Sequence, residues 1–459
     1  MEVRSVWELN LDISVEMALK FGTDGVRGRA FVDLTPEWVA NLAISASDVL
    51  QSDTVVIGTD GRESGEDFVN ALRAGFQSRG LSVWYMGVVP TPAVAHAAAT
   101  HNIAGAMVSA SHNPSTDNGI KLLSAGGKKL SDHAQTEIEA ILESNDFPNT
   151  SLTGNYIKAT HNHLTDGWIT TLNKSIEGRS LKDISLVVDC ANGAVSSYAA
   201  ETLRGLGAKV TSIHDAPDGS NINKDCGSTS IGSLQSAVRS IDADLGLAFD
   251  GDADRVLAID RQGRVIDGDF MIAICAEDMK RRKALTGNTA VVTVMTNLGF
   301  HLSMKEKGIH VHQTPVGDRQ VLAALEEHNW SLGGEQSGHV IFSDLSTTGD
   351  GLLTGIQLLD VMSRTSRSLE ELADTAMVRY PQVLKQVDVS ETTLDIESLL
   401  TDEIAQAEKQ LGDQGRVLVR RSGTEPVLRI MVESTTNEIA ESTVNRLVLA
   451  AESHLGAPE

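Results

Sequence analysis

The chain is poor in the residues that bind nucleic acids and anionic membranes. Its 459 residues include 38 Lys and Arg against 62 Asp and Glu, which gives a net charge of −24. Such an acidic protein repels phosphate backbones and anionic lipid surfaces. Aromatic residues make up only 4%, so few side chains are left to stack on bases. We therefore expect no nucleic acid and no membrane among its partners, whereas an anionic substrate would need Arg and Lys concentrated at one place.

Cysteine and long apolar runs are also scarce. Cys190, Cys226 and Cys275 lie far apart and lack the spacing of a metal motif; an odd, sparse count is typical of a reducing compartment and predicts a cytoplasmic location. No apolar run reaches the about 18 residues that a membrane-spanning helix needs. Residues 1–16 carry four carboxylates and no apolar segment, so we expect an extension before Met17 and no signal peptide.

Several common catalytic motifs are missing. The sequence holds no G-x-x-x-x-G-K-[ST] phosphate loop and no G-x-S-x-G nucleophile elbow, which disfavours a P-loop nucleotidase and lowers the case for a hydrolase. The glycine-punctuated loop at residues 21–28, which presents Arg27, does not match G-x-G-x-x-G either.

Short β-rich runs instead alternate with longer amphipathic stretches. Strands are predicted at 54–57, 81–85, 105–108, 186–188, 245–249 and 290–295, and a helix at 66–79. Repeated β-α-β units predict α/β layers with largely parallel strands. The C-terminal part differs, because two predicted strands at 416–419 and 427–432 precede a predicted helix at 437–454. That order is typical of a separate α+β unit.

Weak boundaries divide the chain into four pieces of ordinary domain size. They lie in the polar stretch at 150–163, the turn at 261–263 and the segment at 379–381. The predicted domains are residues 17–162, 163–261, 262–378 and 379–459.

The sequence around Ser111 is the first candidate for chemistry. A small-residue strand runs directly into Ser109-Ala110-Ser111-His112-Asn113-Pro114. We predict that this turn exposes the Ser111 hydroxyl at a sheet edge, with the His112 imidazole beside it, as a nucleophile requires. A serine that only stabilises the turn is the alternative, since Ser favours turns.

A second candidate is Asp250-Gly251-Asp252-Ala253-Asp254-Arg255, which follows an apolar strand. Three converging carboxylates repel one another unless a hard divalent ion lies between them. The loop does not fit an EF-hand, because Arg255 and Arg261 stand where that loop needs Gly and Glu. Mg²⁺ is favoured because it keeps positions open for phosphoryl oxygens, and Arg255 could meet the same phosphate. A solvated acidic turn is the alternative.

Two more loops combine glycine with polar side chains. The segment 333–339 holds Glu335, Ser337 and His339, a mixture of donors and acceptors suited to sugar hydroxyls. Arg420-Arg421-Ser422-Gly423-Thr424-Glu425-Pro426, with Arg429 beyond it, could form an anion nest. Taken singly, each could be an ordinary turn or hairpin tip.

Together these motifs resemble the α-D-phosphohexomutase superfamily, in order and spacing, from Phe21 to about Glu433. The resemblance implies three similar mixed-sheet α/β domains plus a C-terminal two-layer α+β domain around one central cleft. Within the superfamily, the sequences of the loops around Phe21, Glu335 and Arg420 resemble those of the members that act on amino sugars. This resemblance implies an isomerase of peptidoglycan-precursor metabolism that converts glucosamine 6-phosphate into glucosamine 1-phosphate through glucosamine 1,6-bisphosphate. Members acting on glucose or mannose phosphates are the alternative.

The resemblance also implies residue roles. Ser111 would be the phosphoserine, and one Mg²⁺ would lie among Ser111, Asp250, Asp252 and Asp254. Catalytic positions would be Arg27, Ser111, His112 and Lys121. Phosphate-binding positions would be Arg255, Arg420, Ser422, Gly423, Thr424 and Arg429. Sugar-binding positions would be Glu335, Ser337 and His339. The implied partner is a small phosphosugar, and a homodimer is a further possibility.

Overall fold

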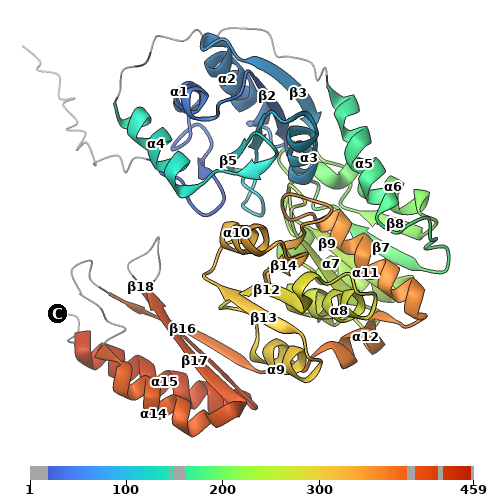
Figure 1. Cartoon of the computed structure of the whole chain (residues 1–459), viewed down its shortest axis with the longest axis vertical. Helices are drawn as coiled ribbons and strands as arrows, with labels where there is room; N and C mark the ends of the chain where they lie inside the picture. The colour runs from blue at the N-terminus through green and yellow to red at the C-terminus, as the bar shows by residue number, and fades with distance from the viewer. Residues whose placement is uncertain (1–18, 145–146, 148–160, 390–398, 422–426, 456–459) are drawn as a thin grey trace, which may run out of the picture.

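Four β-sheets follow one another along the chain, each with its own helices (Figure 1). The computed structural model describes residues 19–144, 147, 161–389, 399–421 and 427–455. The predicted extension of residues 1–16 and the residues Ser422, Gly423 and Thr424 lie outside these ranges. No helix within the described ranges is long and apolar enough to cross a membrane.

The first sheet has β4 near its centre, in the order β1-β5-β4-β2-β3 with β6 paired to β5. β2 pairs with β3 and β4 in parallel, whereas β5 pairs antiparallel with β1, β4 and β6. All five residues of β4 are buried, which is why this strand is a run of small and apolar side chains. The elements of this first unit are β1 (Val26–Arg29), α1 (Pro36–Val49), β2 (Thr54–Thr59), α2 (Gly65–Ser78), β3 (Ser82–Val88), α3 (Thr91–His101), β4 (Ala104–Val108), β5 (Asp117–Ser124), β6 (Lys128–Lys129) and α4 (Asp132–Glu143).

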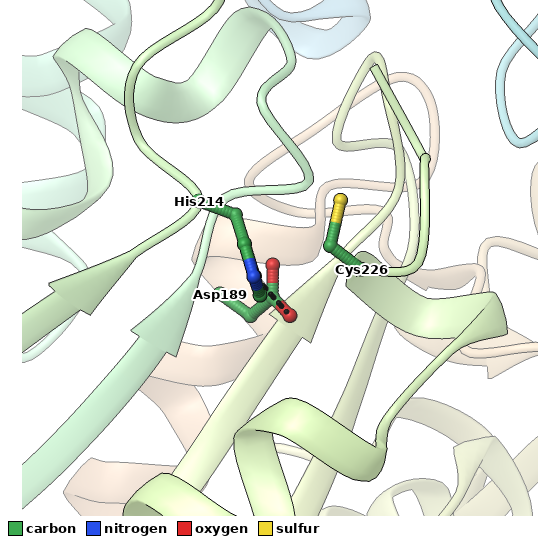
Figure 2. Close-up of side chains that lie close together, drawn as sticks. All are labelled: Asp189, His214 and Cys226. Carbon is green, nitrogen blue, oxygen red and sulfur yellow. Dashed lines mark ion pairs between the residues drawn. The ribbon is translucent and has the colours of Figure 1, made fainter. Parts of the chain in front are cut away.

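The second sheet has the order β11-β10-β9-β7-β8, with β7 parallel to β8 and β9 and the remaining pairs antiparallel. Because β11 pairs with β10, this sheet extends beyond the turn at 261–263 to Ile266. Asp189 at the end of β7 and His214 just after β8 lie close to Cys226 (Figure 2). Its elements are η1 (Asn162–Leu164), α5 (Thr165–Lys174), β7 (Ser185–Asp189), η2 (Ala194–Ser197), α6 (Ala199–Gly205), β8 (Lys209–Ile213), η3 (Gly227–Thr229), α7 (Gly232–Ser240), β9 (Leu245–Phe249), β10 (Val256–Asp260) and β11 (Val265–Ile266).

The third sheet has the order β13-β12-β14-β15; β12 is parallel to β13 and β14, and β15 is antiparallel to β14. Its elements are α8 (Gly268–Arg281), η4 (Thr286–Asn288), β12 (Thr289–Thr293), α9 (Leu298–Glu306), β13 (His310–Thr314), α10 (Asp318–His328), β14 (Leu332–Gly334), β15 (Val340–Phe342), α11 (Gly351–Thr365) and α12 (Leu369–Ala376).

The fourth sheet is wholly antiparallel, in the order β16-β18-β17. α15 packs against β16 and β18, so helices cover one face in a two-layer α+β arrangement. The elements are β16 (Gln382–Asp388), α14 (Thr401–Leu411), η5 (Gly412–Gln414), β17 (Gly415–Arg421), β18 (Val427–Ser434) and α15 (Asn437–Leu455). The architecture predicted from the resemblance, three mixed-sheet α/β units and one α+β unit, is confirmed.

The apolar core joins the first three units and leaves the fourth separate. One cluster of buried residues runs from Val56 in the first sheet through Val188 in the second to Val292 in the third. The fourth unit has its own cluster, which includes Ile430 and Val444. The first three units therefore share one apolar core, whereas the fourth has a core of its own.

Candidate active site

Ser111 lies on the loop that follows β4, above the middle of the first sheet. Its side chain is buried and its φ is +55°, a left-handed conformation that is unusual for a residue with a Cβ. The prediction of an exposed serine at a sheet edge is wrong in both respects. The serine is central because β5 covers β4 on one side, and it is buried because the Asp250 loop of the second unit packs onto it.

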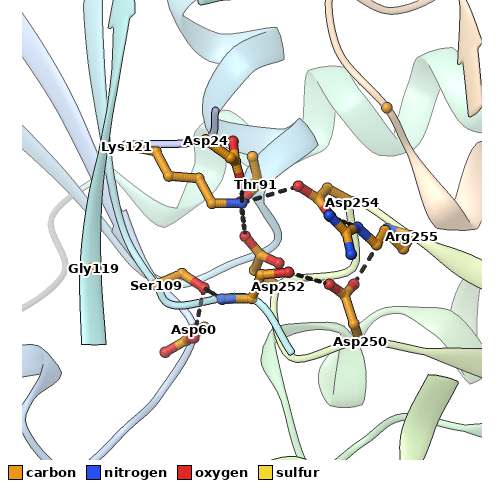
Figure 3. Close-up of polar contacts among 12 residues, drawn as sticks. Asp24, Asp60, Thr91, Ser109, Gly119, Lys121, Asp250, Asp252, Asp254 and Arg255 are labelled. Atoms are coloured by element: carbon orange, nitrogen blue, oxygen red, sulfur yellow. Dashed lines mark hydrogen bonds and ion pairs between the residues drawn. The ribbon is translucent and has the colours of Figure 1, made fainter. Parts of the chain in front are cut away.

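A chain of buried polar groups holds this conformation (Figure 3). The Ser111 amide donates to Ser109 Oγ at 2.8 Å, and that hydroxyl donates to Asp60 Oδ2 at 2.7 Å. Asp60 also accepts from Arg62 Nε at 2.9 Å.

The buried Arg62 guanidinium organises the loop backbone. It donates to the carbonyls of Ser111 at 3.0 Å, Asn113 at 2.9 Å and Asp117 at 2.9 Å, and also to that of Pro114. One side chain thus supplies hydrogen bonds to the carbonyls of a turn that secondary structure leaves mostly without donors.

The three loop aspartates Asp250, Asp252 and Asp254 follow β9, and all are buried. One carboxylate oxygen from each lies within 4.8 Å of the other two. Ser111 Oγ donates to Asp250 Oδ2 at 2.6 Å. Burial and the neighbouring carboxylates of Asp254 and Asp252 raise the pKa of Asp250 well above its usual value. The predicted acidic loop is therefore a buried cluster at the serine and not a solvated turn.

Lys121 of β5 supplies positive charge to this cluster. Its Nζ lies 2.7 Å from Asp252 Oδ2, 2.9 Å from Asp254 Oδ2 and 2.6 Å from Asp24 Oδ2. Burial disfavours the ammonium, but these carboxylates hold the pKa of Lys121 well above its usual value. Lys121 is consequently a fixed cation at neutral pH.

The aspartates fit a hard divalent cation. The buried Oδ1 atoms of Asp252 and Asp254 have no hydrogen-bond partner among the described residues, and one lysine cannot neutralise three carboxylates. Oxygen ligands from carboxylates and a serine oxygen suit Mg²⁺. The residues present could therefore hold a metal ion.

Arg255, His112 and Arg27 stand around Ser111. His112 Nδ1 lies 3.3 Å from Ser111 Oγ and 3.3 Å from Arg255 Nη1. Burial, together with Arg255 and Arg27, lowers the pKa of His112 to about 4, so the imidazole is neutral at pH 7. Arg27 Nη2 pairs with Asp24 at 3.0 Å. The structure brings these predicted residues together.

A cavity of about 340 Å³ opens beside Arg255, and the third unit forms most of its wall. Glu335 and Ser337, two of the three predicted sugar-binding residues, line it, and so do Asp24 and Asp318. Glu335 Oε1 accepts from the Gly317 amide at 3.1 Å, and burial raises the pKa of the Glu335 carboxyl. The volume and the polar lining suit one small polar ligand.

His339 lies behind the cavity wall, fully buried. Its Nδ1 is 3.8 Å from Asp254 Oδ2 and its Nε2 is 3.6 Å from Asp318 Oδ2. Lys129 pairs with Asp24 at 2.5 Å and with Asp318. These charges connect the first, second and third units around the cavity.

The two predicted arginines of the fourth unit lie apart from the cavity. Arg420 of β17 and Arg429 of β18 face each other directly across the sheet. Burial and the neighbouring Arg429 lower the pKa of Arg420, as expected for two cations that lie close together. Neither belongs to the described residues that line the cavity. Ser422, Gly423 and Thr424 lie outside the described residues.

Sequence reasoning missed several residues of the site. Asp60, Arg62 and Lys129 were given no role in the sequence analysis. The Asp60-Gly61-Arg62 sequence, two residues beyond the predicted strand at 54–57, was the available signal, because a charged pair near a buried strand end needs a partner. Thr91, which donates to Asp252 Oδ2 at 2.6 Å, carried no signal.

A second hollow of about 210 Å³ lies where the first three units meet, and His96, Trp168 and Asp350 line it. No described Lys or Arg borders it. An anionic ligand therefore fits the cavity beside Arg255 better.

Four family models together match almost the whole chain. They describe phosphoglucomutase/phosphomannomutase α/β/α domains I, II and III, at residues 18–149, 162–263 and 267–380, and the C-terminal domain of the same proteins, at residues 381–450.

Full-length relatives are similar too. A phosphoglucosamine mutase of Oceanobacillus iheyensis is 45% identical, with 95% of this chain and 99% of that protein covered. A phosphoglucomutase/phosphomannomutase family protein of Burkholderia thailandensis has the same fold, with a TM-score of 0.79 at 24% identity over 97% of this chain and 100% of that one. The N-acetylphosphoglucosamine mutase of Aspergillus fumigatus, solved with GlcNAc-6P and magnesium, gives a TM-score of 0.68 at 16% identity over 96% and 97% of the two chains.

Proposed function

Since the chain belongs to the phosphoglucomutase/phosphomannomutase family, we propose that it is an isomerase that interconverts glucosamine 6-phosphate and glucosamine 1-phosphate. One observation carries the chemistry: the Ser111 hydroxyl is held 2.6 Å from Asp250 within a convergent set of three buried aspartates. The preference for an amino sugar is supported by the relatives named phosphoglucosamine mutase at 43–47% identity.

In the first step, phosphorylated Ser111 donates its phosphoryl group to O1 of glucosamine 6-phosphate. The bond between phosphorus and Ser111 Oγ breaks, a bond to O1 forms, and glucosamine 1,6-bisphosphate results. The proton of the O1 hydroxyl passes, by way of a basic group of the site, to Ser111 Oγ. This oxygen is left as a hydroxyl beside His112 Nδ1 at 3.3 Å.

In the second step, the bisphosphate turns by half a rotation so that its 6-phosphate faces Ser111. The bond between phosphorus and O6 breaks, a bond to Ser111 Oγ forms, and the Ser111 hydroxyl proton passes to O6. Glucosamine 1-phosphate then leaves. The phosphoserine enzyme is thereby regenerated, and atoms and charge balance over the cycle.

Fixed charges stabilise the transferring group. Arg255 and Arg27 stand at Ser111 and can bind phosphoryl oxygens where negative charge develops. A nearby group such as Lys121 or His112 would carry the proton of the sugar hydroxyl.

Asp250, Asp252 and Asp254, with an oxygen of phosphorylated Ser111, would hold one Mg²⁺. When bound, this ion supplies charge neutralisation to the phosphoryl oxygens. Glu335 and Ser337 would bind sugar hydroxyls from the cavity wall, and His339 would support Asp254 from behind.

Arg420, Ser422, Gly423, Thr424 and Arg429 would bind the phosphate that is not being transferred. This nest has to accept either end of the sugar, so it would act through charge and shape. A cytoplasmic location and a homodimer stay predictions.

A substrate panel tests the proposal. Initial rates with glucosamine 6-phosphate, glucose 6-phosphate and mannose 6-phosphate should be highest for the amino sugar. Faster turnover of glucose or mannose phosphate would instead identify a phosphoglucomutase or phosphomannomutase. The intact mass of the purified protein, before and after incubation with the bisphosphate, tests phosphorylation of Ser111.

A further inference from the structure

A second cluster of metal-ligating side chains lies in the second unit, away from the three loop aspartates. One ligand atom each from Asp189, His214 and Cys226 lies within 4.8 Å of the other two (Figure 2). Asp189 and Cys226 are fully buried, and the His214 side chain is 29% exposed. Carboxylate, imidazole and thiol are three different donor types, and the roles proposed above do not use them.

The contact between His214 and Asp189 points to a shared ion. His214 Nδ1 lies 3.1 Å from Asp189 Oδ2, yet this buried nitrogen makes no hydrogen bond with a described residue. Asp189 Oδ2 instead accepts from the Gly227 amide at 3.0 Å, and Oδ1 accepts from the Ala191 amide at 2.9 Å. With a protonated imidazole this contact is an ion pair, whereas with a neutral imidazole the nitrogen and the oxygen are close enough to bind one cation together.

We propose that Asp189, His214 and Cys226 form a binding site for a zinc-class transition metal ion, distinct from the magnesium site. Zinc accepts this combination of oxygen, nitrogen and sulfur, whereas Mg²⁺ takes oxygen ligands only. Bonds of about 2.0–2.3 Å at tetrahedral angles place ligand atoms about 3.3–3.8 Å apart. Side-chain rotations would have to close the difference from the present separations of up to 4.8 Å.

The site would brace the loops beneath the nucleophile. Its ligands come from the ends of β7 and β8 and from the segment before η3. In that same segment, Asn223 Nδ2 donates to the Ser111 carbonyl at 2.9 Å and to the Asn113 carbonyl at 3.0 Å. The next turn of the chain after Asp189 also reaches the aspartate loop, since the Ala194 amide donates to the Gly251 carbonyl at 2.8 Å. The bound ion would therefore hold together the chain segments on which the Ser111 loop packs.

Cobalt binding tests the proposal on the full-length protein. The protein is stripped with a chelator, supplied with excess Mg²⁺ to fill the oxygen site, and titrated with Co²⁺. We expect one equivalent of Co²⁺ to give a thiolate charge-transfer band in the near ultraviolet, which an all-oxygen site cannot produce. Cys226→Ser should abolish the band and His214→Ala should weaken cobalt binding by more than about 10-fold. Cys275→Ser, which removes a buried thiol in α8, should leave the titration unchanged.

A measurement on the protein without substitutions tests the proposal even if the variants do not fold. X-ray absorption of the protein loaded with one equivalent of Zn²⁺, in excess Mg²⁺, should give one sulfur neighbour at about 2.3 Å. A shell of oxygen and nitrogen alone would overturn the proposal, as would a cobalt band that persists in Cys226→Ser. Neither result bears on the mutase reaction, which the substrate panel tests separately.

Discussion

A single oxygen, Ser111 Oγ, separates the proposed mutase from a protein that only binds sugar phosphates. Ser111→Ala removes this oxygen and its 2.6 Å bond to Asp250, while it keeps the Cβ and the loop backbone. We expect at least ~1000-fold lower mutase activity, because no acceptor remains for the phosphoryl group. The thermal unfolding midpoint should change little. Coupled assays and circular dichroism measure both, and Ser115→Ala in the same loop is the control; full turnover by Ser111→Ala would refute the phosphoserine role.

Asp252 has one carboxylate oxygen free for a cation and one bound to Thr91 and Lys121. Asp252→Asn keeps the shape but removes one of the three negative charges. We expect the Mg²⁺ concentration for half-maximal activity to rise at least ~10-fold and the maximal rate to fall with it. Activity at graded Mg²⁺ measures this, with the exposed Asp242→Asn as control. An unchanged Mg²⁺ titration in the Asp252 variant would contradict the proposed metal site.

At the scale of elements, the loop between β4 and β5 depends on one buried side chain. Arg62→Met keeps much of the volume but removes the guanidinium that donates to the carbonyls of Ser111, Asn113 and Asp117. Asn223 still donates to the first two of these carbonyls. We expect the free energy of unfolding to fall by about 2–4 kcal/mol, because buried acceptors and the Asp60 carboxylate lose a partner. The maximal rate should fall as well, since Ser111 moves.

Urea unfolding and steady-state kinetics measure these two effects. Arg79→Met provides the matched control: Arg79 pairs with Asp48 at 2.5 Å, but both side chains are about half exposed. Exposed pairs contribute less than about 1 kcal/mol. Equal losses of stability in the two variants would show that the loop does not depend on Arg62.

Asp350 caps the N-terminus of α11, where it accepts from the Leu353 amide at 2.9 Å and from Trp168 Nε1 at 2.8 Å. Burial raises its pKa to about 6. Because the folded state binds the proton of Asp350 more tightly than the unfolded state does, the protonated carboxyl adds to the stability of the fold below about pH 4. This contribution to stability is lost as the pH rises through about 6.

The stability of the wild type relative to Asp350→Asn should therefore fall by about 2–3 kcal/mol between pH 4 and pH 7.5. Urea unfolding of both proteins at the two pH values measures this difference. Asp374→Asn, at an exposed carboxylate on α12, is the control, and its stability relative to the wild type should be far less dependent on pH. A constant difference between wild type and Asp350→Asn across this range would contradict the raised pKa.

For the whole molecule, the order of elements was predictable because each strand is bounded by turn residues and each helix is amphipathic. The strand predicted at 245–249 coincides with β9, and the helix predicted at 437–454 matches α15 within one residue at its C-terminal end. The burial of Ser111 was not predictable, because it depends on packing between two units. Its partner Asp250 lies 139 residues further along the chain. The role of Arg62 was not predictable either, because its partners are mainly backbone carbonyls. Every residue has a backbone carbonyl, so no sequence pattern indicates which ones Arg62 contacts.

The attachment of the fourth unit could not be predicted either, because it depends on a polar contact between distant segments. Glu433 of β18 is fully buried and accepts from Asn297 Nδ2 and the Leu298 amide, both at 3.0 Å. Arg416 Nε donates to the same carboxylate at 2.5 Å. Since the fourth unit has its own core, this contact at the N-terminus of α9 is one of the polar contacts that hold it against the third, together with that between Arg416 Nη2 and the Thr296 carbonyl.

Glu433→Gln keeps the volume and one acceptor but removes the charge that holds Arg416 and faces the N-terminus of α9. We expect KM for the sugar phosphate to rise about 5- to 10-fold with little change in kcat, because the proposed phosphate nest at Arg420 and Arg429 would be positioned less well for every ligand. Steady-state kinetics and small-angle scattering measure binding and the spread of domain positions. Glu438→Gln, at an exposed site in the first turn of α15, should change neither quantity. If Glu433→Gln gave wild-type KM and scattering, the fourth unit would be held by other contacts, and the buried carboxylate would serve only the local fold.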